Sequence, residues 1–168
     1  MKILVLSDSH AGLSFMRRCI RVVKPDALVH LGDYFDDGEA MAEENPHIRM
    51  HQVPGNCDRY RMVRYEPAVR CYAVCGVKFY MTHGHEHHVK TTLCRLLADA
   101  RAMQAQAVLY GHTHIADCHQ EDDGLWVMNP GACGSSGGSV GVIETLEGQI
   151  VSCQILHQAD LAKLEELV

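Results

Sequence analysis

Acidic, histidine and asparagine side chains occur in five short segments of the chain, and each segment follows a stretch rich in apolar residues. In order, the segments are Asp8-Ser9-His10, Gly32-Asp33, Gly55-Asn56-Cys57-Asp58, Thr82-His83-Gly84-His85 and Gly111-His112-Thr113-His114. Carboxylate, neutral imidazole and amide oxygen are together ligands that suit borderline divalent metals such as manganese, zinc and iron. The segments therefore predict a metal site if the fold brings them together.

The spacing within the segments supports a shared site. Side chains two positions apart in an extended chain point to the same side, so Asp8 and His10 would share a side, and so would His112 and His114. A glycine stands in four of the five segments, where it allows a sharp turn and a close approach of the backbone to an ion. Each motif alone is weak, because Gly-Asp and Asp-x-His pairs are common. All five in this order indicate a metal site.

The elements needed to position these segments can be predicted from the apolar pattern. Short apolar runs predict strands over 2–7, 27–31, 47–53 and 107–110. A hairpin joined at Cys75-Gly76 is predicted from 69–74 and 77–82, followed later by strands over 125–128, 140–145 and 149–156. Helical spacing predicts helices over 13–23, 39–44, 87–103 and 160–167.

Strands and helices alternate in the first half of the chain, whereas the second half is richer in hairpins. This order predicts an α/β (α+β) fold with mixed rather than purely parallel sheets. Ligands bind beyond the carboxyl ends of strands in such sheets, so the five segments are expected to meet at one edge. No repeat or boundary interrupts the 168 residues, and a single domain over 1–168 is expected.

Composition excludes several classes of protein. A net charge of −6 argues against a nucleic-acid binder, although bound metals would reverse the local sign and admit a phosphate substrate. Nothing resembles a signal peptide or a transmembrane segment, so we expect a cytoplasmic chain with eight reduced cysteines and no membrane partner. No Cys-x-x-Cys pair is present, which disfavours a zinc ribbon. The sequence leaves a homo-oligomer open.

The five segments in this order resemble those of the calcineurin-like metallophosphoesterase superfamily, and the short chain is similar to its single-domain YfcE-type phosphodiesterases. The resemblance runs from Asp8 to beyond His114. It implies a four-layer sandwich of two mixed β-sheets flanked by helices. It also implies a metal-dependent phosphoric ester hydrolase, which we expect to be a phosphodiesterase acting on small phosphodiesters.

The resemblance further implies a ligand set for two divalent ions. One ion would be held by Asp8, His10, Asp33 and His114. Asp33 would bridge to the second ion, which would be completed by Asn56, His83 and His112. A hydroxide between the ions, which would lie about 3.5–4 Å apart, would attack phosphorus in line with the leaving oxygen. Manganese is the expected metal, with zinc, iron, nickel and magnesium as alternatives.

Cys57 departs from the pattern of many superfamily members, in which a histidine follows the asparagine and assists catalysis or departure of the leaving group. Small YfcE-type members can also carry Gly-Asn-Cys-Asp, so the cysteine indicates a subfamily. A thiol is a poor substitute for imidazolium as an acid near pH 7. We therefore expect a preference for esters whose leaving groups need little protonation.

Residues beside the ligands have alternative interpretations. Asp58 and His85 are the catalytic candidates among them. Asp58 either orients a ligand histidine through a hydrogen bond or is an ordinary turn aspartate. His85 is a candidate for contact with the substrate or with a ligand. His87 and His88 are expected to face solvent at the start of a helix, and a cluster of arginines either meets a substrate phosphate or lies at the surface: Arg59, Arg61 and Arg64.

Two classes of function remain open after this reasoning. The first is the hydrolase, for which the alternatives to a phosphodiesterase are a phosphomonoesterase, a phosphoprotein phosphatase and a nuclease. A nuclease would be expected to show a basic track, and a protein phosphatase a longer chain. The second class is a non-catalytic protein-binding scaffold on the same fold. Scaffold relatives tend to lose metal-binding histidines, whereas all seven ligand positions are filled here, which favours an enzyme with a small-molecule phosphoester substrate.

Overall fold

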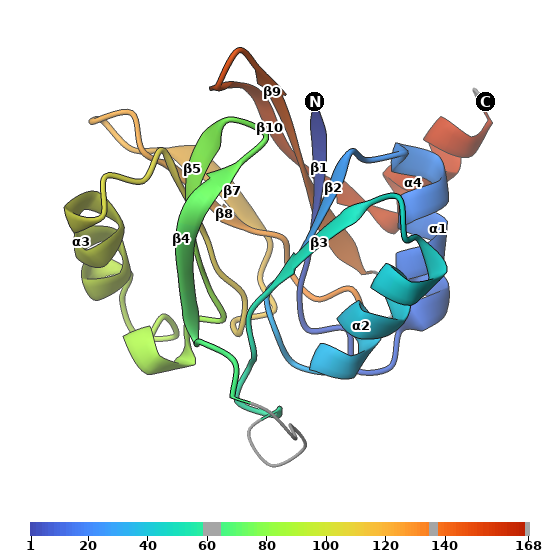
Figure 1. Cartoon of the computed structure of the whole chain (residues 1–168), viewed down its shortest axis with the longest axis horizontal. Helices are drawn as coiled ribbons and strands as arrows, with labels where there is room; N and C mark the ends of the chain where they lie inside the picture. Colours follow the sequence, from blue (N-terminus) through green and yellow to red (C-terminus); the bar gives the residue numbers. More distant parts are fainter. Residues whose placement is uncertain (59–64, 135–137, 167–168) are drawn as a thin grey trace.

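The computed structural model describes residues 1–58, 65–134 and 138–166, and its strands form two five-stranded mixed sheets packed face to face (Figure 1). The first sheet has the order β10-β9-β1-β2-β3 and consists of β1 (Lys2–Leu6), β2 (Ala27–His30), β3 (Arg49–Gln52), β9 (Ser139–Leu146) and β10 (Gln149–His157). The second has the order β4-β5-β6-β8-β7 and consists of β4 (Val69–Val74), β5 (Val77–Thr82), β6 (Ala107–Leu109), β7 (Asp117–Gln120) and β8 (Trp126–Asn129).

Helices cover the outer face of each sheet (Figure 1). The first sheet is covered by α1 (Leu13–Val23), α2 (Phe35–Glu44) and α4 (Gln158–Glu165). The second is covered by α3 (Cys94–Ala102), which follows the short 3-10 helix η1 (His85–His87). The predicted arrangement of two mixed sheets flanked by helices is thereby confirmed. Within the described residues, none of the helices is both long and apolar enough for a membrane span.

Alternation along β1 explains why its four residues after Lys2 are all apolar. Ile3 and Val5 pack into the core between the two sheets, together with Phe79 of β5, whereas Leu4 and Leu6 pack against the helices on the other side. All five side chains are fully buried. Burial of each contributes about 1.5–3 kcal/mol, so β1 is held firmly from both faces. A strand fixed in this way is a rigid support for the residues that follow it.

The carboxyl ends of the central strands point to one edge of the sandwich, at the bottom of Figure 1. In the first sheet β1, β2 and β3 are parallel. In the second sheet β5, β6 and β8 are parallel. The loops after these strands therefore share an edge, as the strand pattern predicts.

Three differences between the observed and the predicted elements are larger than two residues. The helix expected over 87–103 is confined to Cys94–Ala102, because His88 adopts a left-handed conformation with φ 56° where η1 ends. The helix expected from residue 39 begins at Phe35. The sequence does not predict β7, since Asp-Cys-His-Gln lacks the apolar alternation of a half-buried strand, and β7 forms at the sheet edge by pairing with β8.

Candidate metal centre

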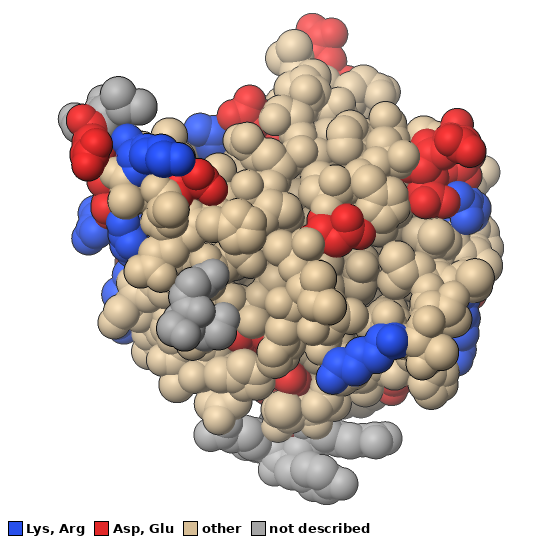
Figure 2. Space-filling view, turned by 180° about the vertical axis from the view of Figure 1, so that it is seen from behind, with Lys and Arg blue, Asp and Glu red and all other residues tan. Residues whose placement is uncertain are grey.

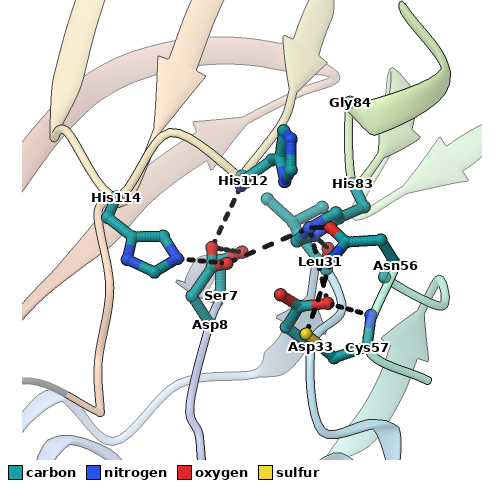
Figure 3. Close-up of polar contacts among 12 residues, drawn as sticks. Ser7, Asp8, Leu31, Asp33, Asn56, Cys57, His83, Gly84, His112 and His114 are labelled. Carbon is teal, nitrogen blue, oxygen red and sulfur yellow. Dashed lines mark hydrogen bonds and ion pairs between the residues drawn. The ribbon is translucent and has the colours of Figure 1, made fainter. Parts of the chain in front are cut away.

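The five polar segments meet at this edge, and the loops after β1, β2, β3, β5 and β6 each contribute side chains (Figure 3). Four residues each offer one oxygen or nitrogen atom, and these atoms all lie within 4.8 Å of one another: Asp8, His10, Asp33 and His114. They are the four residues that the resemblance assigns to one ion. The structure thus brings together residues that are up to 106 positions apart in the sequence.

His83 connects this cluster to the second predicted set. Its Nε2 lies 3.6 Å from Asp33 Oδ1, 3.1 Å from Asn56 Oδ1 and 4.0 Å from Asp8 Oδ1. Its ring meets that of His112 edge to face, with the centroids 5.0 Å apart. Asp33 therefore borders both sets of residues, which is the position that a bridging carboxylate needs.

The two carboxylate oxygens of Asp8 have different surroundings (Figure 3). Oδ2 accepts hydrogen bonds from Ser7 Oγ at 2.6 Å and from the backbone N–H of His112 at 3.1 Å. Oδ1 is buried and receives no hydrogen bond of acceptable geometry from the described residues, although His114 Nε2 lies 3.0 Å away. A buried oxygen without a donor is unfavourable, and a divalent cation between it and the imidazole nitrogen would satisfy both atoms. The donor set therefore fits a divalent metal.

The hydrogen bonds of the histidines also suit metal binding. His83 Nδ1 donates a hydrogen bond to the carbonyl oxygen of Leu31 at 2.7 Å, so Nε2, which faces Asn56 and Asp33, is the nitrogen that a neutral His83 ring would offer to a metal. Burial lowers the pKa of His112 to about 4, with a further contribution from the nearby His83. A neutral ring is the form that binds a metal, so protons compete little for His112 near neutral pH.

Two glycines leave the space that the carboxylates occupy. A Cβ at Gly111 would lie 2.0 Å from Ser7 Oγ and 2.9 Å from Asp8 Oδ2. A Cβ at Gly55 would lie 2.2 Å from Asp33 Oδ1 and 2.3 Å from the backbone nitrogen of Asp33. These glycines are required by close packing around the two aspartates.

Asp58 is buried, and its carboxylate accepts hydrogen bonds from three backbone amides. Oδ1 accepts from Tyr34 and Phe35, both at 2.8 Å, and Oδ2 accepts from Gly55 at 2.7 Å. These partners are backbone groups and not a ligand histidine, so the contacts match the turn alternative. Asp58 fastens the Asn56 loop to the start of α2, directly beside Asp33. Whether it takes part in catalysis stays a prediction.

The remaining histidine candidates have different positions. His85 is half-buried, and its ring centroid lies 5.4 Å from that of His83 and 6.1 Å from that of His112, so it borders the second predicted set. The prediction that His87 faces solvent is wrong, because η1 turns this side chain inward, where its Nε2 lies 3.0 Å from Tyr80 Oη. His88 is exposed. The three arginines lie outside the described residues: Arg59, Arg61 and Arg64.

Cys57 contacts Asp33 through its backbone, since its N–H donates to Asp33 Oδ1 at 2.9 Å. Its side chain is exposed, and Asn56 Nδ2 lies 3.5 Å from Sγ. Partial burial, followed by the hydrogen bond and negative charge of Asp33, raises the pKa of the thiol to about 11. The thiol is therefore protonated near neutral pH and is a weak acid.

Asn129 supports the loop of His112 and His114, a role that sequence reasoning misses. Its Nδ2 donates to the carbonyl oxygen of Gly111 and to Thr113 Oγ1, both at 3.0 Å, and its Oδ1 accepts from the backbone N–H of Gly131 at 2.9 Å. The Asn-Pro-Gly sequence signals a turn but not this partner, which comes from a different strand end.

Comparisons with known proteins identify the family. Residues 1–166 match the calcineurin-like phosphoesterase superfamily domain. The chain belongs to this family. Membership in the calcineurin-like phosphoesterases supports a metal-dependent hydrolase of phosphoesters, as the resemblance of the five segments predicts.

Individual relatives agree with this assignment. The chain is 28% identical over 147 residues to the phosphodiesterase MJ0936 of Methanocaldococcus jannaschii, across 79% of this chain and 84% of that protein. A "predicted phosphoesterase" of Streptococcus pneumoniae TIGR4 has a similar structure, with a TM-score of 0.72 and 23% identity over 94% of this chain and 90% of that one. Vps29 of Entamoeba histolytica, solved with zinc, has a TM-score of 0.68 and 17% identity over 94% of this chain and 99% of that one. At these identities the structural likenesses show the fold alone.

Proposed function

We propose that the chain is a dinuclear-metal phosphodiesterase that acts on small phosphodiesters. The first ion would be held by Asp8, His10, Asp33 and His114, and the second by Asp33, Asn56, His83 and His112. The observation that carries the proposal is the position of Asp33 between the two sets, next to a buried oxygen of Asp8 that receives no hydrogen bond from the described residues.

The chemistry follows from the charges and the exposure of these residues. Divalent ions at such a centre lower the pKa of bound water and neutralise negative charge on a phosphoryl group that is being transferred. Asp8 and Asp33 are buried carboxylates that would hold such ions, while His10 and His114 lie at the exposed rim. Among the described residues, the side of the centre formed by His10 and His114 is therefore open to a small substrate from solvent.

One observation favours a diester over a monoester: the relative from Methanocaldococcus jannaschii is named a phosphodiesterase. The thiol of Cys57 is a weak acid, so we expect a preference for esters of either class whose leaving groups need little protonation. We propose manganese as the metal because the donors are nitrogen and oxygen atoms, which suit it, with zinc and iron accepted by the same donors.

The described residues give no support for a nuclease. Figure 2 shows one face of the molecule, on which lysine and arginine side chains lie mainly at the left edge, next to acidic side chains, and are few over the rest of the face. Several arginines of α1 and α3 pair with carboxylates, as in Arg17 with Glu44 and Arg101 with Asp123. Cations paired in this way do not form the continuous basic track that a polynucleotide requires.

A protein-binding scaffold is the second candidate, supported by the structural likeness to Vps29. Both candidates can be separated in one assay. The protein is stripped of metal with a chelator, reconstituted with manganese, zinc, iron or magnesium, and assayed on an aryl phosphodiester and on the matching monoester. We expect metal-dependent hydrolysis of the diester at a kcat/KM at least tenfold above that of the monoester.

A phosphomonoesterase and a non-catalytic scaffold would give different activities in this experiment. A higher kcat/KM for the monoester would indicate a phosphomonoesterase. Absence of metal-dependent turnover on both substrates, in protein that binds two ions, would favour the scaffold. His83→Ala serves as the control, since it removes a predicted ligand and should abolish any activity that belongs to this centre.

A further inference from the structure

The loop that carries His10 is held by a buried carboxylate outside the predicted ligand set. Asp37, in the first turn of α2, is 8% exposed. Its Oδ2 accepts one hydrogen bond from Ser9 Oγ at 2.7 Å and one from the backbone N–H of Ala11 at 2.8 Å. Ser9 and Ala11 flank His10 in the sequence, so Asp37 fixes the chain on both sides of a predicted ligand.

This loop depends on such contacts because its backbone conformation is unfavourable. Asp8, His10 and Ala11 all have positive φ, at 53°, 42° and 67°. L residues with side chains disfavour this left-handed region, and a free loop of the same sequence would populate extended conformations instead. Tertiary hydrogen bonds are therefore needed to keep the His10 ring in the cluster.

The hydroxyl of Ser9 has a second buried partner, which limits its freedom further. His30 Nε2 lies 3.2 Å from Ser9 Oγ. Of the two acceptors of the hydroxyl proton, Asp37 Oδ2 at 2.7 Å is nearer than the carbonyl oxygen of Asp33 at 3.3 Å. With the proton directed to Asp37, the oxygen accepts from an N–H at His30 Nε2, and His30 Nδ1 has no hydrogen bond from the described residues. The result is a buried chain of hydrogen bonds from His30 through Ser9 to Asp37.

The start of α2 also contacts the His10 ring directly. The rings of Tyr34 and His10 meet edge to face with centroids 5.2 Å apart, and the His10 and His114 centroids are 5.5 Å apart. The short segment 33–37 therefore contributes the predicted ligand Asp33, the ring of Tyr34 that contacts His10, and the carboxylate of Asp37 that holds the backbone beside His10. Movement of this segment would displace two predicted ligands of the same ion together.

We propose that Asp37 is a positioning residue for the ion assigned to Asp8, His10, Asp33 and His114: its carboxylate sets the conformation of residues 9–11 and thereby aims the His10 imidazole at that ion. The inference rests on the proposed function only in requiring this ion. The role is indirect, since the Asp37 oxygens contact the loop and not the cluster atoms.

Metal binding by the whole chain tests this inference without an activity assay. Metal-free protein is titrated with Co²⁺, while calorimetry reports affinity and the visible spectrum reports coordination. We expect the natural chain to bind two ions and Asp37→Ala to bind one of them about 10–100-fold more weakly, the range for residues that orient metal ligands, with the other ion bound within threefold of normal. Asp36→Ala is the matched control, because Asp36 is the exposed neighbour in the same turn, and it should bind both ions normally.

A double mutant separates positioning from a general loss of stability. If Asp37 acts through His10, Asp37→Ala should cost no further affinity once His10→Ala has removed the ligand. Equal losses of affinity in both backgrounds, equally weakened binding of both ions, or normal binding by Asp37→Ala would overturn the inference.

Asp37→Asn, which retains an acceptor oxygen without the charge, should lose less metal affinity than Asp37→Ala. It answers the same question if Asp37→Ala does not fold. Two ions in the natural chain with no effect at Asp37 would overturn this inference alone, whereas a natural chain that binds no ion would overturn the proposed function as well.

Discussion

Replacement of Asp58 by asparagine changes one atom of the side chain whose hydrogen bonds connect the Asn56 loop to the start of α2. The side chain accepts from three backbone amides, two at Oδ1 and one at Oδ2. The amide oxygen of asparagine can keep the pair from Tyr34 and Phe35, and its NH₂ group then faces the N–H of Gly55. One charge-assisted hydrogen bond is lost, and two buried donors oppose each other, which together cost about 3 kcal/mol.

The assay for Asp58→Asn is urea unfolding of the metal-free protein, so that the free energy of unfolding does not include metal binding. A loss of about 3 kcal/mol corresponds to a Tm lower by roughly 6–12 °C for a chain of this size. Asp36→Asn, at an exposed position in the first turn of α2, should change stability by less than about 0.5 kcal/mol. Unchanged stability of metal-free Asp58→Asn combined with lost metal binding would refute this reasoning and restore the alternative in which Asp58 orients a ligand histidine.

Three further predictions concern single residues. Burial lowers the pKa of His30 to about 4, so the unfolded chain binds a proton below pH 6.5 that the folded chain does not. Between pH 7.5 and 4.5 this one group should lower the free energy of unfolding by about 2.5 kcal/mol, and His30→Gln should lose that much less stability than the natural chain in urea unfolding. The Cβ of Gly55→Ala would meet the backbone of Asp33, so this variant should lower the free energy of unfolding by about 1–3 kcal/mol and weaken metal binding in calorimetry. Normal stability and normal metal affinity would show that the loop can move to make room for the added methyl group. Rates on aryl phosphodiesters should fall as the leaving-group pKa rises, and Cys57→His should flatten that dependence. A flat dependence in the natural chain, with the chemical step rate-limiting, would contradict the claim that no efficient acid protonates the leaving group.

The meeting of the five polar segments at one edge could be predicted because each follows a strand that is evident in the sequence. The strand before Asp8 is an apolar run, and its burial on both faces of the sheet leaves Ser7 and Asp8 as the first polar residues at the edge. The hairpin before His83 is equally clear, since β4 and β5 have the predicted bounds. Local pattern therefore suffices for the strands and for the loops at their ends.

The supporting residues could not be predicted, because their partners are distant in the sequence. Asp37 bonds to Ala11, 26 positions away, and Asp58 bonds to Phe35, 23 positions away. His30 lies in an apolar strand and gives no local signal of its bond to Ser9. The start of α2 depends on the same contacts, since Asp58 accepts from the backbone amides of Tyr34 and Phe35, which is why the helix begins four residues before the predicted position.

The most direct test of the two-metal centre compares metal content and diester hydrolysis in the natural chain and in Asp33→Asn. Asp33 borders both predicted sets, so its loss should affect both ions, whereas loss of any other ligand should affect mainly one. We expect two manganese ions per natural chain, at most one per Asp33→Asn chain, and a kcat/KM for the diester that is lower by at least about 10³-fold, the loss expected when both ions no longer act together. Two tightly bound ions with full diesterase activity in Asp33→Asn would contradict the bridging role and, with it, the two-metal centre.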